Sequence, residues 1–461
     1  MSELPKGWKT VLIDEVTEVI SGGTPKSTVP EYYTEEHGDA IAWVTPADLS
    51  GYKKQTISHG RRSITNSGYE SCSAKLMPKG SVLFSSRAPV GYVVIADNEI
   101  STNQGFKSFV PYDGVDSQYL YYYLKSIKHL AESLATGTTF KELSGKVAKT
   151  LPFPLAPLAE QKRIVEKLDE VLAQVDTIKA RLDGIPALLK RFRQSVLASA
   201  VSGKLTEEWR EECDEDTSWR QITLKEAAHI QDPHPSHRTP SVVEGGIPFV
   251  SIGDLREDGS IDVDNARKVS PEVLKEHKAR YALKEGDFIF GKIGTLGKAT
   301  VLPMGIDFAL SANVILIQPE ISLAEPKYIQ YFLSSPTTMD EVAKQANSTS
   351  QAAFGIKKMR AFICRLPTKN EQKEIVRLVD QYFVFADTIK AQVKKAQARV
   401  DNLTQSILAK AFRGELVAQD PNDEPADKLL ERIAEARKEA EALAKAAKKA
   451  EAAKKRAAKI A

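Results

Sequence analysis

Apolar residues recur at alternating steps of three and four along two long stretches of the chain. In residues 160–205 they are Ile164, Leu168, Val171, Val175, Ile178 and Leu182. In residues 371–416 they are Ile375, Val379, Tyr382, Ala386, Ile389, Val393, Ala396, Val400, Leu403 and Ile407. This spacing is typical of the a/d seam of a coiled coil. It predicts two long amphipathic helices, each with a seam that must be buried against a partner.

These two stretches are copies of one another. They align without a gap at an offset of 211 residues, with 19 of 46 positions identical. Each copy is the simplest partner for the other, and a chain that crosses one domain between them can return antiparallel. The alternative is a pair of unrelated amphipathic helices on separate domains, and the gapless match argues against it.

One tripeptide interrupts the first copy. Gly184-Ile185-Pro186 stands where the second copy has Lys395-Ala396-Gln397. Proline is tolerated at the start of a helix but disfavoured inside one. We therefore expect a bend or a helix restart in the first copy only.

The regions before each copy are related more weakly. Ile41–Leu49 resembles Ile247–Leu255, and Ser101-Thr102-Asn103 resembles Ser311-Ala312-Asn313. Short β-rich runs bounded by Gly or Pro predict strands, and two polar–apolar runs predict helices. The strands are expected at 81–84, 92–95, 287–290 and 314–317, and the helices at 118–128 and 327–334. The predicted fold class is α+β, with two globular domains separated by two antiparallel coiled-coil helices in a pseudo-twofold repeat.

This organisation predicts five segments. They are a first domain (1–157), a central helical spacer (158–210), a second domain (211–366), a distal helical spacer (367–418) and a tail (419–461). The tail is rich in Ala, Lys and Glu, and we expect a helix that frays toward Ala461. Two interpretations of that helix stay open: a solvated helix, or one that docks on a partner.

The net charge of +3 does not point to nucleic acid by itself. Residues 435–461 hold nine Lys or Arg and four Asp or Glu, so the rest of the chain sums to −2. A bulk electrostatic attraction to DNA is thereby excluded. DNA binding requires local basic patches or partners that supply positive charge.

Location and redox chemistry follow from two further observations. No apolar run approaches the roughly 18–20 residues that span a bilayer, and residues 1–8 contain no signal-peptide core. Cys72, Cys213 and Cys364 are far apart and form no C-x-x-C pair, which argues against disulfides and zinc. We expect a soluble, cytoplasmic protein without a membrane partner.

Motifs for catalysis are incomplete throughout. Residues 286–293 approach a P-loop, but Ile293 replaces the Ser or Thr that binds magnesium, and the apolar interior favours a strand. Glu160-Gln161-Lys162 contains a nuclease-like Glu-x-Lys, yet it opens a helix, where Glu suits the dipole. His234 and His237 lack a third metal ligand. We expect no catalytic residue, no metal and no cofactor in this chain.

A series of motifs resembles the specificity subunit of type I restriction–modification enzymes, across the chain to about residue 416. These motifs are Ser21–Pro25, Ile41–Thr45, Phe84–Gly91, Thr102–Lys107 and Pro154–Gln161, and the stretch Leu158–Leu205 is most like the branch typified by the K12 enzyme of enteric bacteria. The second domain departs from the first, with Pro235–Pro240 in place of Gly-Gly-Thr-Pro and Lys292 near the place of Arg87.

The resemblance implies a function. Each domain is expected to recognise one half of a bipartite target in double-stranded DNA, and the helices to act as a ruler and docking surface. Two modification (methyltransferase) subunits that bind S-adenosylmethionine, and two restriction (translocase) subunits that use ATP and Mg, are the implied partners.

Candidate contacts follow from the residue types that recognise bases and phosphates. In the first domain we expect DNA contacts from Thr24, Lys26, Ser27, Arg87, Asn103, Gln104, Lys107, Thr138, Thr139 and Lys141. In the second domain we expect them from His237, Arg238, Lys292, Lys298, Asn313, Ser350, Gln351, Lys357 and Lys358. Partner contacts are expected from Lys162, Arg163, Lys190 and Arg191. The alternatives are plain solvated surface and, for the two Asn residues, turn capping.

Three rival functions stay open. An enzyme with concealed motifs predicts S-adenosylmethionine binding or DNA cleavage by the isolated chain. A coiled-coil scaffold predicts protein binding without DNA protection. A specificity subunit that serves methylation alone predicts no restriction partner.

Overall fold

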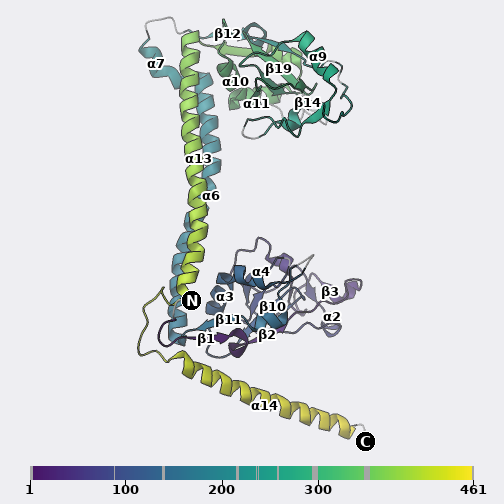
Figure 1. The fold of residues 1–461 in the computed structure, drawn as a ribbon, viewed down its shortest axis with the longest axis vertical. Helices are drawn as coiled ribbons and strands as arrows, with labels where there is room; N and C mark the ends of the chain where they lie inside the picture. Colours follow the sequence, from purple (N-terminus) through teal and green to yellow (C-terminus); the bar gives the residue numbers. More distant parts are fainter. Residues whose placement is uncertain are drawn as a thin grey trace. The chain divides into compact units, whose positions relative to one another are not determined.

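The computed structural model describes residues 4–87, 89–137, 141–213, 218–234, 236, 238–256, 259–292, 299–346 and 354–458. The chain forms two compact units. Unit 1 comprises Met1–Arg181 and Gln397–Ala461, and unit 2 comprises Leu182–Ala396. Figure 1 shows the elements of each unit, and each unit is described by itself.

Unit 1 is built on a five-stranded sheet. The strand order is β2 (Thr17–Ser21), β10 (Lys107–Pro111), β7 (Val82–Phe84), β8 (Val93–Ala96) and β5 (Thr56–Ile57), antiparallel except for β5 beside β8. Helix α3 (Ser117–Ser126) lies against β7 and β8, and begins where Asp116 accepts hydrogen bonds from two backbone amides. Phe84, Phe109 and Tyr119 are fully buried. These elements confirm the strands and helix predicted there.

Smaller elements complete unit 1. They are β1 (Lys9–Leu12), α1 (Ile13–Val16), η1 (Pro30–Tyr32), β3 (Tyr33–Thr34), β4 (Trp43–Val44), η2 (Pro46–Leu49), β6 (Ser63–Ile64), α2 (Asn66–Glu70), β9 (Ser101–Thr102), α4 (Lys128–Leu134), α5 (Gly145–Lys149) and β11 (Pro152–Leu155). Strand β1 pairs with β11, so the start and the end of this domain are joined.

Unit 2 repeats this plan with a divided sheet. One sheet has the order β13 (Ala228–Gln231), β19 (Val314–Pro319), β16 (Phe288–Gly291) and β17 (Ala299–Val301). A second has the order β15 (Arg267–Val269), β14 (Ile247–Val250) and β18 (Ala309–Leu310). The predicted strands at 287–290 and 314–317 are confirmed, and so is the helix at 327–334, as α10 (Pro326–Ser334).

The remaining elements of unit 2 close its core. They are η3 (Lys204–Thr206), α7 (Glu207–Glu211), β12 (Arg220–Thr223), α8 (Leu224–Ala227), η4 (Ile252–Asp254), α9 (Pro271–Arg280), α11 (Pro336–Gln345), α12 (Ile356–Ala361) and β20 (Ile363–Leu366). Strand β12 pairs with β20, the counterpart of β1 with β11. The mixed α+β class is therefore confirmed for both domains.

The heptad seams pair as predicted. Helices α6 (Leu158–Ser202) and α13 (Lys369–Ala411) have 45 and 43 residues and contribute to both units. In unit 1 the Lys179 ammonium binds Asp401 at 2.6 Å, and in unit 2 the Arg193 guanidinium binds Asp387 at 2.7 Å. Positions that rise along α6 meet positions that fall along α13, so the helices are antiparallel. The unrelated-helix alternative is therefore wrong.

The helix restart predicted at Gly184-Ile185-Pro186 does not occur, because α6 is one helix with Pro186 inside it. The bend, which was its alternative, stays a prediction. Proline lacks one backbone donor and crowds the carbonyl four residues earlier, but these costs do not end the helix.

We expect Gly184→Ala to stabilise the chain by about 0.5–1 kcal/mol, since alanine reduces the backbone entropy lost in a helix. A Cβ at Gly184 meets nothing within 4 Å. Thermal unfolding of the full chain measures the change. Gly203→Ala is the matched control and should destabilise, because Gly203 ends α6 with a φ of 87°. A lower melting temperature for Gly184→Ala would contradict this account.

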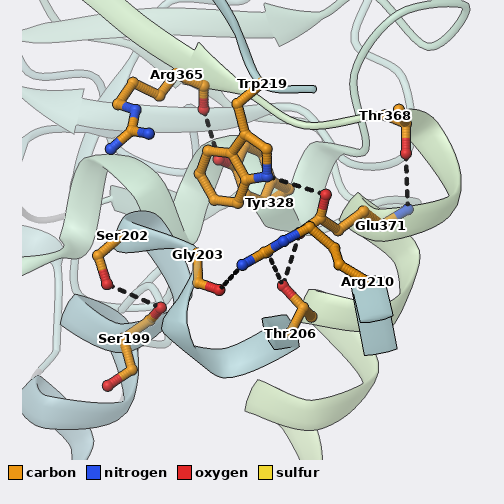
Figure 2. A network of polar contacts seen from close by, with 10 residues as sticks. All are labelled: Ser199, Ser202, Gly203, Thr206, Arg210, Trp219, Tyr328, Arg365, Thr368 and Glu371. Carbon is orange, nitrogen blue, oxygen red and sulfur yellow. Dashed lines mark hydrogen bonds and ion pairs between the residues drawn. The ribbon is translucent and has the colours of Figure 1, made fainter. Parts of the chain in front are cut away.

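A buried glutamate begins each long helix, and its partners come from distant parts of the same unit. In unit 2 (Figure 2), Glu371 accepts hydrogen bonds from the Trp219 indole at 2.9 Å and the Thr206 hydroxyl at 2.7 Å. Arg210 forms an ion pair with Glu371 and donates to the Gly203 carbonyl at 2.6 Å. These contacts tie the end of α6, the start of the second domain and the start of α13 together.

Unit 1 repeats this network without the cation. Trp8 donates to Glu160 at 2.9 Å, and Gln419 donates to Glu160 at 3.4 Å and to the Gly414 carbonyl at 2.6 Å. Trp8 and Glu160 are 152 residues apart, as are Trp219 and Glu371. Burial raises the pKa of the Glu160 carboxyl, because the hydrogen bonds from Trp8 and Gln419 and the charge of Arg163 offset the lost hydration only in part.

The tail begins with a packed segment rather than a solvated one. Helix α14 (Ala426–Ala458) buries Ala426, Leu429 and Ile433 in unit 1. Asp427 pairs with Lys9 at 2.7 Å, and Arg437 donates to the backbone carbonyl of Asp14 at 3.0 Å. Neither a solvated helix nor a helix that docks on a partner describes these first turns, because they pack within unit 1. Within the described residues, no helix is long and apolar enough to cross a membrane.

Candidate nucleic-acid interface

The motif-bearing loops of unit 1 converge on one another. The Gly23 amide donates to the Thr102 carbonyl at 2.9 Å, and the Ser86 amide donates to the Gly105 carbonyl at 2.7 Å. The Leu143 amide donates to the Ser86 carbonyl at 2.9 Å. Gly22 lies so close to the 102–103 backbone that a Cβ would be 2.0 Å from the Asn103 carbonyl oxygen. Four segments far apart in sequence therefore form one surface. We call it loop cluster 1, and it comprises residues 21–27, 85–87, 102–107 and 141–144.

Two of the predicted cations in loop cluster 1 share one carboxylate. Arg87 lies 3.6 Å and Lys107 3.4 Å from Glu142. Lys107 is only 7% exposed, whereas the Arg87 side chain is one-third exposed. Since the carboxylate neutralises one of two cations, the group keeps one positive charge, and Arg87 is the member that solvent and ligands can reach.

Other predicted residues of unit 1 divide into exposed and engaged side chains. Lys26, Ser27 and Lys141 are exposed. Thr24 and Gln104 bind each other through their side chains, and Asn103 accepts from the Gly105 amide at 2.9 Å, so Asn103 caps a turn. Thr138 and Thr139 lie outside the described residues.

Beside loop cluster 1 lies a basic cleft that the sequence reasoning missed. Its volume is about 630 Å³, and its lining includes Lys75, Lys146 and Lys149 together with Ser21 and Gly22. Lysines in a cleft suit phosphate oxygens, which supply much of the affinity in protein–DNA complexes. The available signal was the pair Lys146 and Lys149, which follows the predicted contact Lys141 in the sequence.

In unit 2 three of the predicted residues line one cavity. Arg238, Lys292 and Asn313 surround a cavity of about 310 Å³ with His234. Lys292 is 3.2 Å from Asp232, and both side chains are mostly buried. The Asn313 side-chain oxygen accepts from the Ile252 amide at 3.3 Å, so Asn313 also has a structural role. Arg238 is the exposed cation of this group.

Strand pairing corrects two sequence correspondences. Trp43 pairs with Ser101 in unit 1, and Phe249 pairs with Ala309 in unit 2. Asn103 therefore corresponds to Ser311 and not to Asn313, because the second domain has two more residues before this strand. By the same backbone pattern Lys292 takes the place of Ser86, since Phe354 donates to the Lys292 carbonyl at 3.0 Å.

The remaining candidates are spread over both units. Lys357 is exposed, and Lys358 donates to the Gln345 carbonyl. Of the partner-binding candidates, Lys162, Lys190 and Arg191 are exposed on α6. Arg163 is engaged within unit 1, 2.6 Å from Asp423. His237, Lys298, Ser350 and Gln351 lie outside the described residues.

Two motifs that resemble catalytic ones have structural roles. Glu160 of the Glu-x-Lys motif binds Trp8, and the P-loop-like segment holds strand β16, as predicted. Burial raises the pKa of the Cys364 thiol to about 12, so it stays protonated at neutral pH. Over the described ranges, no three His, Cys, Asp or Glu side chains gather as a metal site.

Comparison with known proteins matches this architecture. The family model for the type I restriction modification DNA specificity domain matches twice, at residues 5–187 and 217–397. The EcoKI specificity subunit of Escherichia coli strain K12 is 33% identical over 94% of this chain and 96% of its own length. The EcoBI specificity subunit of Escherichia coli is 35% identical over 70% of this chain and 73% of its own length.

Solved structures agree at the level of the fold. A chain from work on assembly and conformational transition of the type I R-M system has a TM-score of 0.63 at 19% identity, covering 90% of this chain and all of that one. The HsdS subunit from Thermoanaerobacter tengcongensis has a TM-score of 0.56 at 19% identity, covering 90% of this chain and 98% of its own. The repeated family match and the full-length relatives show that the chain belongs to the family of type I restriction–modification DNA specificity subunits.

Proposed function

We propose that this specificity subunit recognises a bipartite DNA target, one half with each unit. The proposal rests on one observation. In each of the two repeated domains, distant loops bring polar and basic side chains together at the corresponding place. Loop cluster 1 presents Arg87 and Gln104, whereas unit 2 presents Arg238 beside Lys292. Different side chains on one framework are expected to recognise different bases.

Chemistry on the target is assigned to partner subunits. We propose two modification subunits that bind S-adenosylmethionine and methylate adenine, and two restriction subunits that use ATP and Mg to translocate and cleave DNA. The exposed cations Lys162, Lys190 and Arg191 on α6 support a docking role for that helix. The complex is expected in the cytoplasm, where its DNA substrate is found.

Methylome sequencing tests the proposal. Cells that express this chain with its modification subunit should gain methyladenine at one motif, made of two short halves with a fixed gap between them. Cells that lack the chain should show none of it. A stable complex that adds no methylation would contradict target recognition. Methylation without any cleavage of unmodified phage DNA would identify a methylation-only system.

Point variants assign the halves to the units. Lys26→Ala should relax the motif in the half that unit 1 recognises, and Arg238→Ala in the other half, since each good base contact is worth about 1–3 kcal/mol. Lys79→Ala is the control. Lys79 lies before the first residue of β7, whereas segment 85–87 of loop cluster 1 follows the last residue of that strand. If both variants relaxed the same half, the one-unit, one-half assignment would fail.

A further inference from the structure

Two buried histidines hold the segment of unit 2 that carries Arg238. His234 and His277 are 7% and 3% exposed, and His234 Nδ1 lies 3.0 Å from His277 Nε2. His234 Nε2 lies 2.9 Å from the Arg238 carbonyl oxygen and 2.8 Å from the Ser236 hydroxyl oxygen, so a hydrogen on this nitrogen is shared between two groups of the same segment. His277 is on α9 and comes 43 residues after His234, so this contact joins a helix to a loop.

The proton positions in this chain of bonds follow from one backbone donor. The Leu310 amide donates to His277 Nδ1 at 3.4 Å, so that nitrogen is an acceptor and carries no hydrogen. The Tyr281 hydroxyl, 3.0 Å from the same atom, then donates as well. A neutral His277 therefore has its hydrogen on Nε2 and donates to His234 Nδ1. His234 in turn donates from Nε2 to the Arg238 carbonyl.

Burial and nearby cations favour the neutral form of His277. Burial is the largest cause and acts together with His234 and Arg280 to lower the pKa of His277 to about 4. Arg280 donates to the Asp232 carbonyl at 3.4 Å. Lys292 pairs with Asp232, and Lys278 pairs with Asp307 at 2.7 Å. A proton added to His277 at Nδ1 would meet the Leu310 amide and the Tyr281 hydroxyl, which already donate to that atom.

We propose that His277 and Tyr281 are positioning residues for DNA recognition by unit 2, which act through His234 to hold Arg238 against its cavity. The inference rests on the proposed target recognition and deepens it. Neither side chain has to touch DNA. They fix the position of the Arg238 backbone, and that position determines where the guanidinium can lie.

A pH dependence follows from this arrangement. The pKa of His277 in the fold lies below its ordinary value of 6.5, so the neutral ring stabilises the fold above pH 6.5. That contribution is lost as the pH falls from about 6.5 toward about 4. The free energy of unfolding of unit 2 should therefore fall in this window. Affinity for the target depends on the ring in the folded chain, so it should hold until the pH nears about 4.

The experiment measures binding of the chain, in complex with its modification subunit, to a duplex that carries the motif mapped by methylome sequencing. At pH 7.5, His277→Ala should weaken binding about tenfold, the size of one lost base contact. Scrambling the half that unit 2 recognises should then have little further effect. Scrambling the other half should still abolish specific binding.

Three further variants keep the test informative if His277→Ala folds poorly. His277→Gln can donate to His234 and does not titrate, so it should bind like the wild type at pH 7.5, and its melting temperature should not show the wild type's fall as the pH drops from 6.5 toward about 4. Tyr281→Phe removes one donor and should weaken binding about threefold. His229→Gln is the control, because His229 is exposed on β13, and it should keep the wild-type pH profile.

Two outcomes are decisive and distinct. Wild-type binding without sequence preference would overturn the proposed function. Sequence-specific binding by the wild type, together with unchanged affinity and an unchanged pH profile in His277→Ala and His277→Gln, would overturn the positioning role alone.

Discussion

Glu371→Gln is expected to destabilise unit 2 by about 2–3 kcal/mol. The substitution leaves the Arg210 guanidinium, whose side chain is 23% exposed, without its counter-charge. Removal of one partner of a fully buried pair typically costs about 3–5 kcal/mol, and the partial exposure of Arg210 reduces this. Trp219 donates to one carboxylate oxygen and Thr206 to the other, so the single oxygen of the glutamine amide can accept from only one of them. The expected loss therefore combines one hydrogen bond with the counter-charge of Arg210.

The corresponding change in unit 1 should behave differently. Glu160 forms no ion pair with any described residue, and burial raises the pKa of its carboxyl despite the charge of Arg163. Ionised Glu160 therefore costs unit 1 stability above this raised pKa, and the cost disappears as the pH falls below it. Glu160→Gln removes the charge and is expected to be neutral or slightly stabilising at pH 7.

Hydrogen-exchange mass spectrometry of the full chain resolves both effects. Glu371→Gln should speed exchange around 203–211, 219–223 and the start of α13, while Glu160→Gln should leave the segments around 8–12 and 152–165 as slow as in the wild type. Equal destabilisation by both substitutions would show that the Arg210 charge is not what distinguishes the two networks.

Gly22→Ala is expected to disrupt loop cluster 1. A Cβ there would lie 2.0 Å from the Asn103 carbonyl oxygen and 2.4 Å from that of Thr102. Both atoms belong to a backbone held by strand β9, so they cannot move aside as a side-chain tip can. Overpacking typically costs about 1–3 kcal/mol, and we expect the upper end of that range.

The functional consequence should be confined to one half-target. Separation of segments 21–24 and 102–105 would displace Thr24 and Gln104 and relax recognition by unit 1. Methylome sequencing and thermal unfolding measure the two effects. Gly38→Ala is the control, since a Cβ there meets nothing within 4 Å. Wild-type stability and an unchanged motif in Gly22→Ala would mean that the two loops are not in close contact.

The helices were the most predictable part of the molecule, because heptad spacing is a local property that repeats over many turns. Leu168, Val175, Val393 and Val400 are buried as the seam requires, whereas Ile178, Tyr382 and Leu403 of the predicted seam are 46%, 40% and 46% exposed. Helix α6 continues through Pro186, where the proline alone predicted a bend or a restart.

Candidate DNA contacts were harder to predict than the loops that carry them. Lys107 and Arg87 look alike in sequence, yet one is buried beside Glu142 and the other is accessible. Asn103 and Asn313 resemble each other in sequence, but strand pairing places them at different positions. Side-chain exposure depends on which distant segments pack against the residue, and the spacing of residues along the sequence does not predict that packing.

Periodicity and motif order along the chain were sufficient to predict the α+β class, the internal repeat, the antiparallel helix pair and the family. The fold was needed to find that Trp8 and Gln419 meet Glu160, that Arg210 supplies the charge beside Glu371, and that four loops form one surface. The physical reason is that buried polar groups need partners, and the backbone can bring those partners from any distance along the sequence.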